Sequence, residues 1–191
     1  MNTIVTTLTT EAVFSDDGVK RYLLRKTWDE KKKKLTIIML APSNASGIEL
    51  DNSTLLVLNN ASRLGFGSVD ILNLSATLDD YDLKKTDLDD GENMDVVIRS
   101  VECADVIVYA AGVGKTKNKI FQKLQRRLLD NLKLYESKLC CISNETGSAR
   151  LQHPLSPAVR IWYLSPLKIG ELVDGVIEES SKQKKKAKDK I

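Results

Sequence analysis

Short, mainly apolar runs separated by helix-type patterns are the feature that most constrains the fold of this chain. Four such runs occupy residues 35–41, 69–74, 105–110 and 139–143. A strand that is apolar at consecutive positions is buried on both faces, as in a parallel sheet with helices on each side. Apolar residues recur at helical spacing in residues 52–64, 93–104 and 117–134. This alternation predicts an α/β fold, a three-layer sandwich with a mainly parallel central sheet.

The two ends of the chain add to this plan. Residues 12–28 contain two β-rich runs on either side of Asp17 and Gly18, a pair typical of a hairpin turn. We therefore expect an N-terminal β-hairpin at one edge of the sheet. Towards the other end, residues 159–164 predict a fifth strand and residues 168–179 a closing helix.

The positive charge of the chain lies in its last residues. The chain of 191 residues has a net charge of +3, and the segment 178–191 alone supplies that excess through its lysines. We expect residues 1–177 to form a single α/β domain and residues 178–191 to be a disordered tail. Two interpretations of the tail are open: weak, salt-sensitive contact with nucleic acid, or a solvated end that aids solubility.

Several classes of protein and site are disfavoured. The sequence has no apolar stretch of membrane-spanning length and no secretory signal pattern, so we expect a cytoplasmic protein without membrane contact. Cys103, Cys140 and Cys141 are interpreted as small buried apolar residues. His153 is the sole histidine, which leaves too few ligands for a zinc site. The acidic segment 79–95 does not fit a calcium loop. We expect neither a metal nor a cofactor.

In parallel sheets, ligands bind beyond the carboxyl ends of the strands. The segments 41–45, 73–76, 110–115 and 143–153 should therefore surround one opening, provided that the strand order brings these ends together.

One of these segments resembles a phosphate-binding turn. Gly112, Gly114 and Lys115 lie between an expected strand and an expected helix. Tyr109 occupies the position of the first glycine of a Walker A motif, so that motif is broken. Exposed amides at a helix N-terminus still attract an anion, and Lys115 would add a point charge. The alternative is a tight strand-to-helix connection.

A second segment centres on His153, which is followed by Pro154 in a polar loop that also contains Ser156. A histidine held beside proline is suited to donate a proton or a hydrogen bond to a developing oxyanion. The alternative is a structural histidine that caps loop carbonyls.

The order of these motifs resembles a known family. The segments FSDDG at 14–18, RY at 21–22, LAPSNA at 40–45, GFG at 65–67, NL at 73–74 and HPL at 153–155 appear in that order. They are similar to domain-of-unknown-function family 1643, whose pattern includes FSxDG, RY, LNPSxA, a helix ending in GYG, NLFA and HPLY. The resemblance spans residues 12–160.

That family in turn resembles uracil-DNA glycosylase-like proteins, which implies a glycosylase-like fold and a site built from two loops. In such proteins an early loop positions water near the glycosidic carbon, and a late-loop histidine stabilises negative charge on the departing base. The resemblance implies a catalytic role for His153. The expected ligand-binding residues are Pro42, Ser43, Asn44, Asp51, Asn73, Gly112, Gly114, Lys115, His153 and Ser156.

The departures from the family pattern shape the functional hypotheses. Ala41 stands where the pattern has a water-holding asparagine, and losing such a group costs about 2–4 kcal/mol in a transition state. Our first hypothesis is therefore a nucleobase- or nucleotide-binding protein with weakened or lost glycosylase chemistry. The alternatives are an active enzyme on a nucleobase in DNA or in a nucleotide, and a non-catalytic module that binds DNA or a protein. The expected partners are a nucleobase, a nucleotide or DNA.

Overall fold

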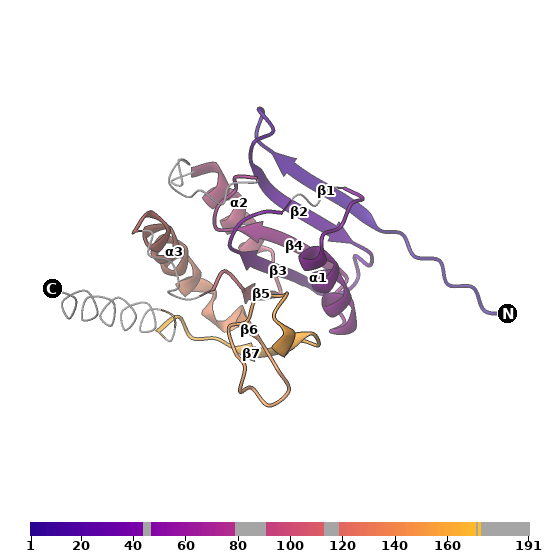
Figure 1. The fold of residues 1–191 in the computed structure, drawn as a ribbon. Helices are drawn as coiled ribbons and strands as arrows, with labels where there is room; N and C mark the ends of the chain where they lie inside the picture. The colour runs from indigo at the N-terminus through magenta and orange to yellow at the C-terminus, as the bar shows by residue number, and fades with distance from the viewer. Residues whose placement is uncertain (44–46, 79–90, 113–118, 171, 173–191) are drawn as a thin grey trace.

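A seven-stranded sheet with the strand order β1-β2-β4-β3-β5-β6-β7 organises the chain. The computed structural model describes residues 1–43, 47–78, 91–112, 119–170 and 172 (Figure 1). The strands are β1 (Thr9–Phe14), β2 (Arg21–Thr27), β3 (Lys34–Met39), β4 (Ser68–Asn73), β5 (Val106–Tyr109), β6 (Leu139–Ser143) and β7 (Tyr163–Pro166). The helices are α1 (Asn52–Arg63), α2 (Gly91–Glu102) and α3 (Lys119–Leu132), with the 3-10 helices η1 (Lys133–Lys138) and η2 (Pro157–Val159).

The expectation of a mainly parallel sheet is wrong, because the sheet is mixed. The central strands β4, β3, β5 and β6 run parallel to one another. The hairpin of β1 and β2 adds two antiparallel junctions on one side, and β7 adds a third on the other. β7 runs antiparallel to β6, and the described connection between them contains η2 but no α-helix.

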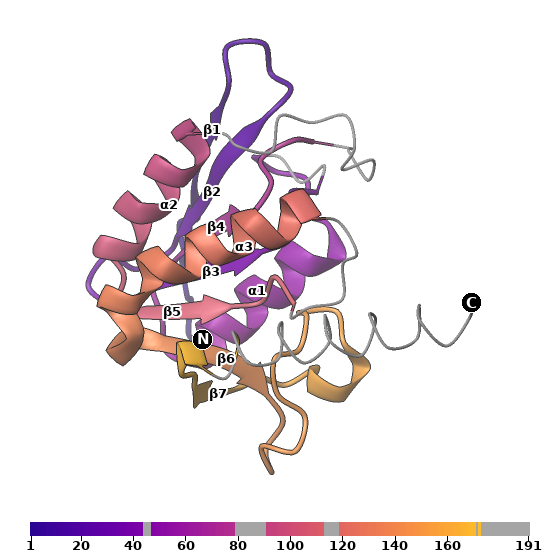
Figure 2. The same ribbon diagram turned by 90° about the vertical axis from the view of Figure 1, so that its left-hand side faces the viewer.

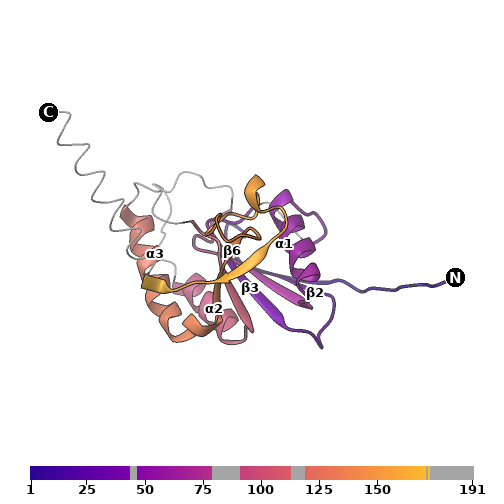
Figure 3. The ribbon, with the colours of Figure 1, turned by 90° about the horizontal axis from the view of Figure 1, so that it is seen from below.

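Helices cover both faces of the sheet. α2 and α3 lie on one face, where Leu72, Val97 and Leu128 belong to one apolar core (Figures 2 and 3). α1 lies on the opposite face, where Val57, Ile71 and Trp162 belong to a second core. The central strands are apolar at consecutive positions because each contributes side chains to both cores.

Local sequence signals set the ends of several elements as expected. The carboxylate of Asp51 accepts a hydrogen bond of 2.6 Å from the backbone N–H of Thr54, which caps the start of α1. Gly65 follows the end of α1 with a φ of 86°. Gly18, with a φ of 70°, lies in the turn between β1 and β2, as the hairpin prediction required.

Other expectations need correction. The fifth strand predicted at residues 159–164 begins later, as β7, and is preceded by η2. The strand begins later because the backbone N–H of Trp162 donates its hydrogen bond to the Asn60 side chain of α1. This N–H is therefore not available for pairing with β6. All three cysteines are free, and Cys141 is buried, but Cys103 is exposed.

Some predicted features fall outside the described residues. They are most of the closing helix at 168–179, the tail at 178–191 and most of the acidic segment at 79–95. None of the described helices has the length and apolar character needed to cross a membrane.

Candidate functional site

The topology defines a switch point at the carboxyl edge of the sheet. From β3 the chain passes through α1 to β4 on one side, and later reaches β5 on the other side of β3. The helix after β3 lies on one face of the sheet, and the helix after β5 lies on the opposite face. Loops that leave neighbouring strands toward opposite faces create the crevice in which α/β proteins bind ligands. The loops after Met39 and Tyr109 flank this position.

The loop after β3 supplies the first group of site residues. Pro42 is buried, and Ser43 and Asp51 are half-buried. The Ser43 side chain makes a hydrogen bond with the Asp51 carboxylate, which also caps α1. Asn44 lies outside the described residues. The two ends of this loop are therefore joined through Ser43 and Asp51.

Arg21 of β2 holds this loop through its buried side chain. Its side chain is only 1% exposed, and its Nη1 donates a hydrogen bond of 3.0 Å to the Ser43 carbonyl. Burial lowers the pKa of the Arg21 guanidinium, and the negative charge of Asp51 opposes that shift. A buried cation that holds a loop carbonyl restrains the loop without facing solvent.

A β-bulge gives Arg21 this orientation. Val13 of β1 pairs with Leu23, but the next residue, Phe14, pairs with Arg21, so β2 contains one extra residue at Tyr22. An extra residue in one strand reverses the alternation of the side chains that follow it. The Tyr22 hydroxyl donates a 2.7 Å hydrogen bond to Glu92 at the start of α2. Arg21 instead reaches the α1 face, where Ser43 and Asp51 lie.

Asp51 connects the early loop with the late loop. Burial acts to raise the pKa of Asp51, but the hydrogen bonds from Ser43 and Thr54, together with the charge of Arg21, hold it below its ordinary value. The carboxylate is therefore ionised at neutral pH. Its charge also acts on His153, which lies about a hundred residues later in the chain. Ser43, Asp51 and His153 thus belong to one electrostatic neighbourhood.

His153 is an exposed residue of the late loop, and its imidazole has a lowered pKa. Restricted hydration lowers the pKa of the His153 imidazole, and the charge of Asp51 only partly opposes this. The Nδ1 atom accepts a 3.2 Å hydrogen bond from the backbone N–H of Leu155. The neutral ring must then carry its proton on Nε2. The loop is fixed further by Ser156, whose hydroxyl donates a 2.8 Å hydrogen bond to Gln152.

Asn73 is a buried polar residue at the end of β4. It is 1% exposed, it pairs with Met39 of β3, and its Nδ2 has no hydrogen-bond partner among the described residues. Alternation along β4 places Asn73 on the same face as Ile71, which packs in the α1 core. The backbone carbonyl of Asn73 accepts a 3.1 Å hydrogen bond from Asn93 on the α2 side. A fixed backbone therefore presents an amide whose donor is unused.

The turn after β5 is also built on buried polar contacts. Gly112 has a φ of 80°, and its carbonyl accepts hydrogen bonds of 3.0 Å from the Tyr109 hydroxyl and 2.9 Å from Gln125 on α3. Burial raises the pKa of Tyr109 to about 12, although its hydrogen bond with Gln125 acts in the opposite direction. Gly114 and Lys115 lie outside the described residues, so this geometry bears only on Gly112.

Two residues of the site were not among those predicted. The sequence motifs include Arg21 only within the RY pair and do not include Lys26. Lys26 is 1% exposed, and its Nζ donates to the Gly47 carbonyl and, at 2.8 Å, to the Thr10 hydroxyl. Burial lowers the pKa of its ammonium group. Cations within an otherwise apolar strand are the sequence signal that points to them.

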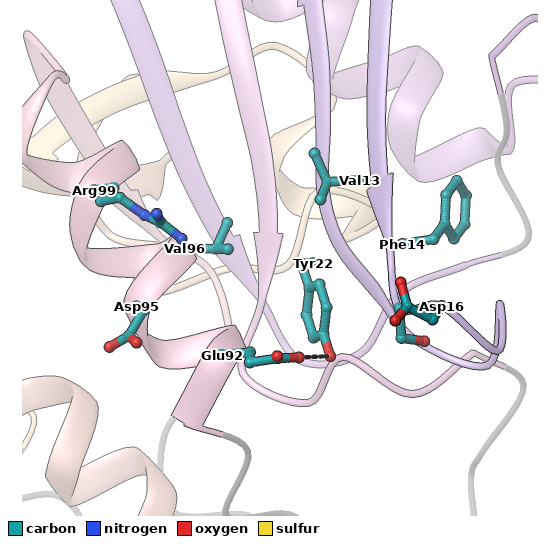
Figure 4. Close-up of a pocket in the computed structure, with 9 residues that line it drawn as sticks. Val13, Phe14, Asp16, Tyr22, Glu92, Asp95, Val96 and Arg99 are labelled. Carbon is teal, nitrogen blue, oxygen red and sulfur yellow. Dashed lines mark hydrogen bonds between the residues drawn. The ribbon is translucent and has the colours of Figure 1, made fainter.

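One hollow formed by the described residues lies away from these loops. It has a volume of about 300 Å³ and lies between the start of α2 and the β1–β2 hairpin (Figure 4). Val13, Tyr22, Glu92, Val96 and Arg99 are among its lining residues. A neighbouring hollow of about 320 Å³ shares Val13, Val96 and Arg99 and continues toward Cys103. Both lie on the α2 side, opposite the face that holds Ser43 and Asp51.

The fold and the site define an α/β protein with a polar cluster at the carboxyl edge of a mixed sheet. Residues 21–155 match DUF1643, a family described as protein of unknown function. The match covers most of the chain, so the chain belongs to this family. Comparisons with curated proteins and with solved structures gave no match.

Proposed function

We propose that the carboxyl edge of the sheet binds a nucleobase or a nucleotide on the α1 face. The site would consist of Asn73, the loop from Pro42 to Asp51, and His153. This assignment is supported by the strand order, which has its switch point beside β3, and by the polar residues at the ends of β3 and β4. The glycosylase-like, three-layer architecture implied by the family resemblance is part of the same proposal.

The observation that carries the proposal is the unused amide donor of Asn73. A buried amide group without a partner costs about 1–3 kcal/mol, and a ligand that bonds to the Asn73 amide would remove this cost. A carboxamide presents a donor and an acceptor side by side, and this pattern matches the edge of a nucleobase. Asn73 extends from a backbone fixed by β3 and Asn93. A rigid carboxamide of this kind would read the base edge.

His153 and Asp51 complement this role. The Nε2–H of neutral His153 would donate to a carbonyl oxygen of the base, where negative charge gathers. The ionised Asp51 would accept from an N–H or a hydroxyl of the ligand. Ala41, at the end of this edge, offers no polar atom to hold water, so the proposal is binding with weakened or lost cleavage of the glycosidic bond.

The Asp51–His153 neighbourhood favours a second candidate, an enzyme acting on a nucleobase in DNA or in a nucleotide. An ionised carboxylate near a neutral imidazole is a usual arrangement for a base and an electrophilic group. In that case Asp51 would replace the missing polar residue at position 41. Substitution His153→Ala should then abolish turnover of whichever base or nucleotide binds, whereas full turnover by this variant would remove histidine from the mechanism.

Isothermal titration calorimetry with a panel of free bases, nucleosides and nucleotides tests the binding proposal. We expect micromolar binding of at least one compound, and a loss of about tenfold or more in the Asn73→Leu variant. Asn59→Leu is a matched control, because Asn59 is an exposed residue of α1. No heat of binding with any compound at high micromolar concentration would reject the proposal.

A further inference from the structure

The segment before β1 lies outside the helices and strands of the described residues. Residues 1–8 are all exposed, and they run away from the body of the molecule (Figures 1 and 3). Ile4 and Val5 are 85% and 87% exposed, and Leu8 is 49% exposed. Apolar side chains at this exposure are unfavourable in water. We call residues 1–8 the N-terminal arm.

The arm continues into the less protected edge of the sheet. β1 pairs only with β2 among the described residues, so its outer N–H and C=O groups face solvent. The other edge strand, β7, has four residues and ends at Pro166, whose carbonyl accepts a 2.7 Å hydrogen bond from Arg150. Short length, proline and coverage are the devices that protect an edge. β1 has none of them, and Glu11 is its only charged residue.

The arm has the composition of a strand. Residues 2–10 include no proline, glycine or charged side chain, and consist mainly of threonine, isoleucine, valine and leucine. β-branched residues of this kind favour an extended, half-buried position. One segment of the chain therefore supplies both an unpaired strand and an unpaired edge.

We propose that two copies of this chain form a dimer in which the arm of each copy pairs antiparallel with β1 of the other. The occupant of the β1 edge is then a second copy of the chain. The two sheets would join into one continuous sheet through the paired strands.

The side chains select one register. A two-fold axis through an antiparallel pair keeps each residue on its own face, so the two residue numbers of every opposed pair have an even sum. With Thr9 opposite itself, Ile4 of one copy lies opposite Phe14 of the other, and Val5 lies opposite Val13. Phe14 is 43% exposed in the single chain, and Val13 is only partly buried. This register places apolar side chains opposite each other and covers the whole outer edge of β1.

A register centred one residue nearer the N-terminus loses these apolar pairs. With Leu8 opposite itself, Phe14 would lie opposite Asn2 and Val13 opposite Thr3. The Thr9 register also keeps the single charge, Glu11, opposite Thr7, so no like charges meet. Because each copy would contribute only one short arm and one edge strand, we expect an interface at the lower limit for stable complexes, about 1,200 Å² in total. We therefore expect a dimer that dissociates at low micromolar concentration.

Multi-angle light scattering during size-exclusion chromatography tests the dimer. At about 200 µM the full chain should show twice its monomer mass of 21.3 kDa. The double variant Ile4→Lys, Val5→Lys should show the monomer mass, because in the dimer the two lysines would lie opposite Phe14 and Val13. The matched control is Ile48→Lys, Leu134→Lys, which changes two equally exposed apolar residues, at 94% and 86%, and should remain dimeric.

Cysteine cross-linking tests the register. In a Cys103→Ser background, Thr9→Cys should form an intermolecular disulfide under mild oxidation, because opposed Cα atoms lie about 4.5–5.5 Å apart. Thr7→Cys should not, because the two copies of residue 7 would be separated by four residues along the strands. A monomer at every concentration, or a dimer that survives the arm variant, overturns the proposal; cross-linking through residue 7 in preference to residue 9 overturns the register.

Discussion

Tyr22 and Leu23 are consecutive residues of β2, and the side chains of both lie on the α2 face of the sheet. Tyr22 donates its hydroxyl to Glu92 of α2, and Leu23 packs in the core that α2 covers. Consecutive residues of a regular strand point to opposite faces, so the shared face identifies Tyr22 as the extra residue of the bulge. The bulge thereby directs Arg21 to the loop that carries Ser43 and Asp51.

The first prediction concerns this orientation. Arg21→Met keeps the length of the side chain but removes the hydrogen bond to the Ser43 carbonyl and the charge beside Asp51. Because hydrogen bonds to charged groups are the stronger class, we expect the free energy of unfolding to fall by about 2–3 kcal/mol. Tyr22→Phe removes one hydrogen bond near the surface and should cost about 1 kcal/mol or less.

Urea unfolding followed by tryptophan fluorescence measures both losses. If the Arg21 contact fixes the loop, amide exchange at residues 47–50 should also accelerate in Arg21→Met and remain unchanged in Tyr22→Phe. Equal effects of the two substitutions on stability and on exchange would contradict the role given to the bulge.

The second prediction compares two buried asparagines. Asn73 is 1% exposed, and its Nδ2 has no partner in the described part of the chain, whereas Asn60 is 4% exposed and bonds to three backbone groups, those of Leu56, Arg160 and Trp162. Replacing an unsatisfied polar group by an apolar one of similar size is close to neutral. Asn73→Leu should therefore change the free energy of unfolding by less than about 1 kcal/mol, whereas Asn60→Leu should lower it by about 3 kcal/mol.

Thermal and urea unfolding of the two variants check this comparison. A large loss of stability in Asn73→Leu would show that Asn73 has a structural partner, and would weaken its assignment to ligand binding. A stable Asn73→Leu variant that no longer binds ligand would separate the site from the scaffold.

The third prediction uses the sole histidine as a probe of the site. The charge of Asp51 raises the pKa of His153, against the larger lowering by restricted hydration. Asp51→Asn removes that charge but retains a good N-cap residue for α1. The pKa of His153 should then fall further below 6.5. The Cε1–H signal in a proton NMR titration reports it directly, because no other histidine contributes.

Stability against pH gives a second measure of the same contact. The folded-state pKa of Asp51 lies below its ordinary value of 3.8, so its contribution to stability is present above pH 3.8 and is lost as the pH falls through the lower folded value. Wild type should therefore be more stable than Asp51→Asn at neutral pH, and the difference should shrink below pH 3.8. Asp95→Asn, on the exposed side of α2, is the control. If the pKa of His153 is the same in Asp51→Asn as in wild type, the Asp51 carboxylate does not act on His153, and the two residues do not belong to one site.

The sequence contained enough information for the central strands and not for the details of the site. β6 occupies residues 139–143, as predicted, because strands buried on both faces are apolar at every position. The bulge at Tyr22 has no such sequence signal. Tyr22, Leu23 and Leu24 are all apolar, so the sequence does not show which of them shares a face with its neighbour. The start of β7 depends on the contact between Asn60 and Trp162, which are distant in sequence. Tertiary contacts decided both features.

The candidate site was predictable to a similar extent. Ser43, Asp51 and His153 are predicted from motifs. In the structure the Asp51 carboxylate makes a hydrogen bond with Ser43, and its charge acts on the pKa of His153. Arg21 and Lys26 are not predictable as site residues from the sequence. Their role depends on hydrogen bonds to the carbonyls of Ser43 and Gly47, and these contacts leave no pattern in the sequence. Strand β2 could be recognised from its pattern, but which face each cation occupies could not.

The last prediction concerns Gly67, the second glycine of the GFG motif. A Cβ atom at Gly67 would lie 1.9 Å from the Asp29 carbonyl oxygen and 2.7 Å from the Lys32 Cβ. The same glycine receives backbone hydrogen bonds of 2.9 Å and 3.0 Å from Trp28 and Asp29 at its carbonyl, so the two segments cannot separate without breaking these bonds. Gly67→Ala should therefore lower the free energy of unfolding by about 3 kcal/mol or more.

Gly47→Ala is the matched control, because a Cβ at Gly47 would meet no atom within 4 Å. The same substitution there should change the free energy of unfolding by less than about 0.5 kcal/mol. Chemical unfolding of the two variants distinguishes the steric cost from the general effect of adding a methyl group. A stable Gly67→Ala variant would mean that the turn between β2 and β3 can move away from Gly67. In that case the close approach of the two backbones could not explain why the family pattern has glycine at this position.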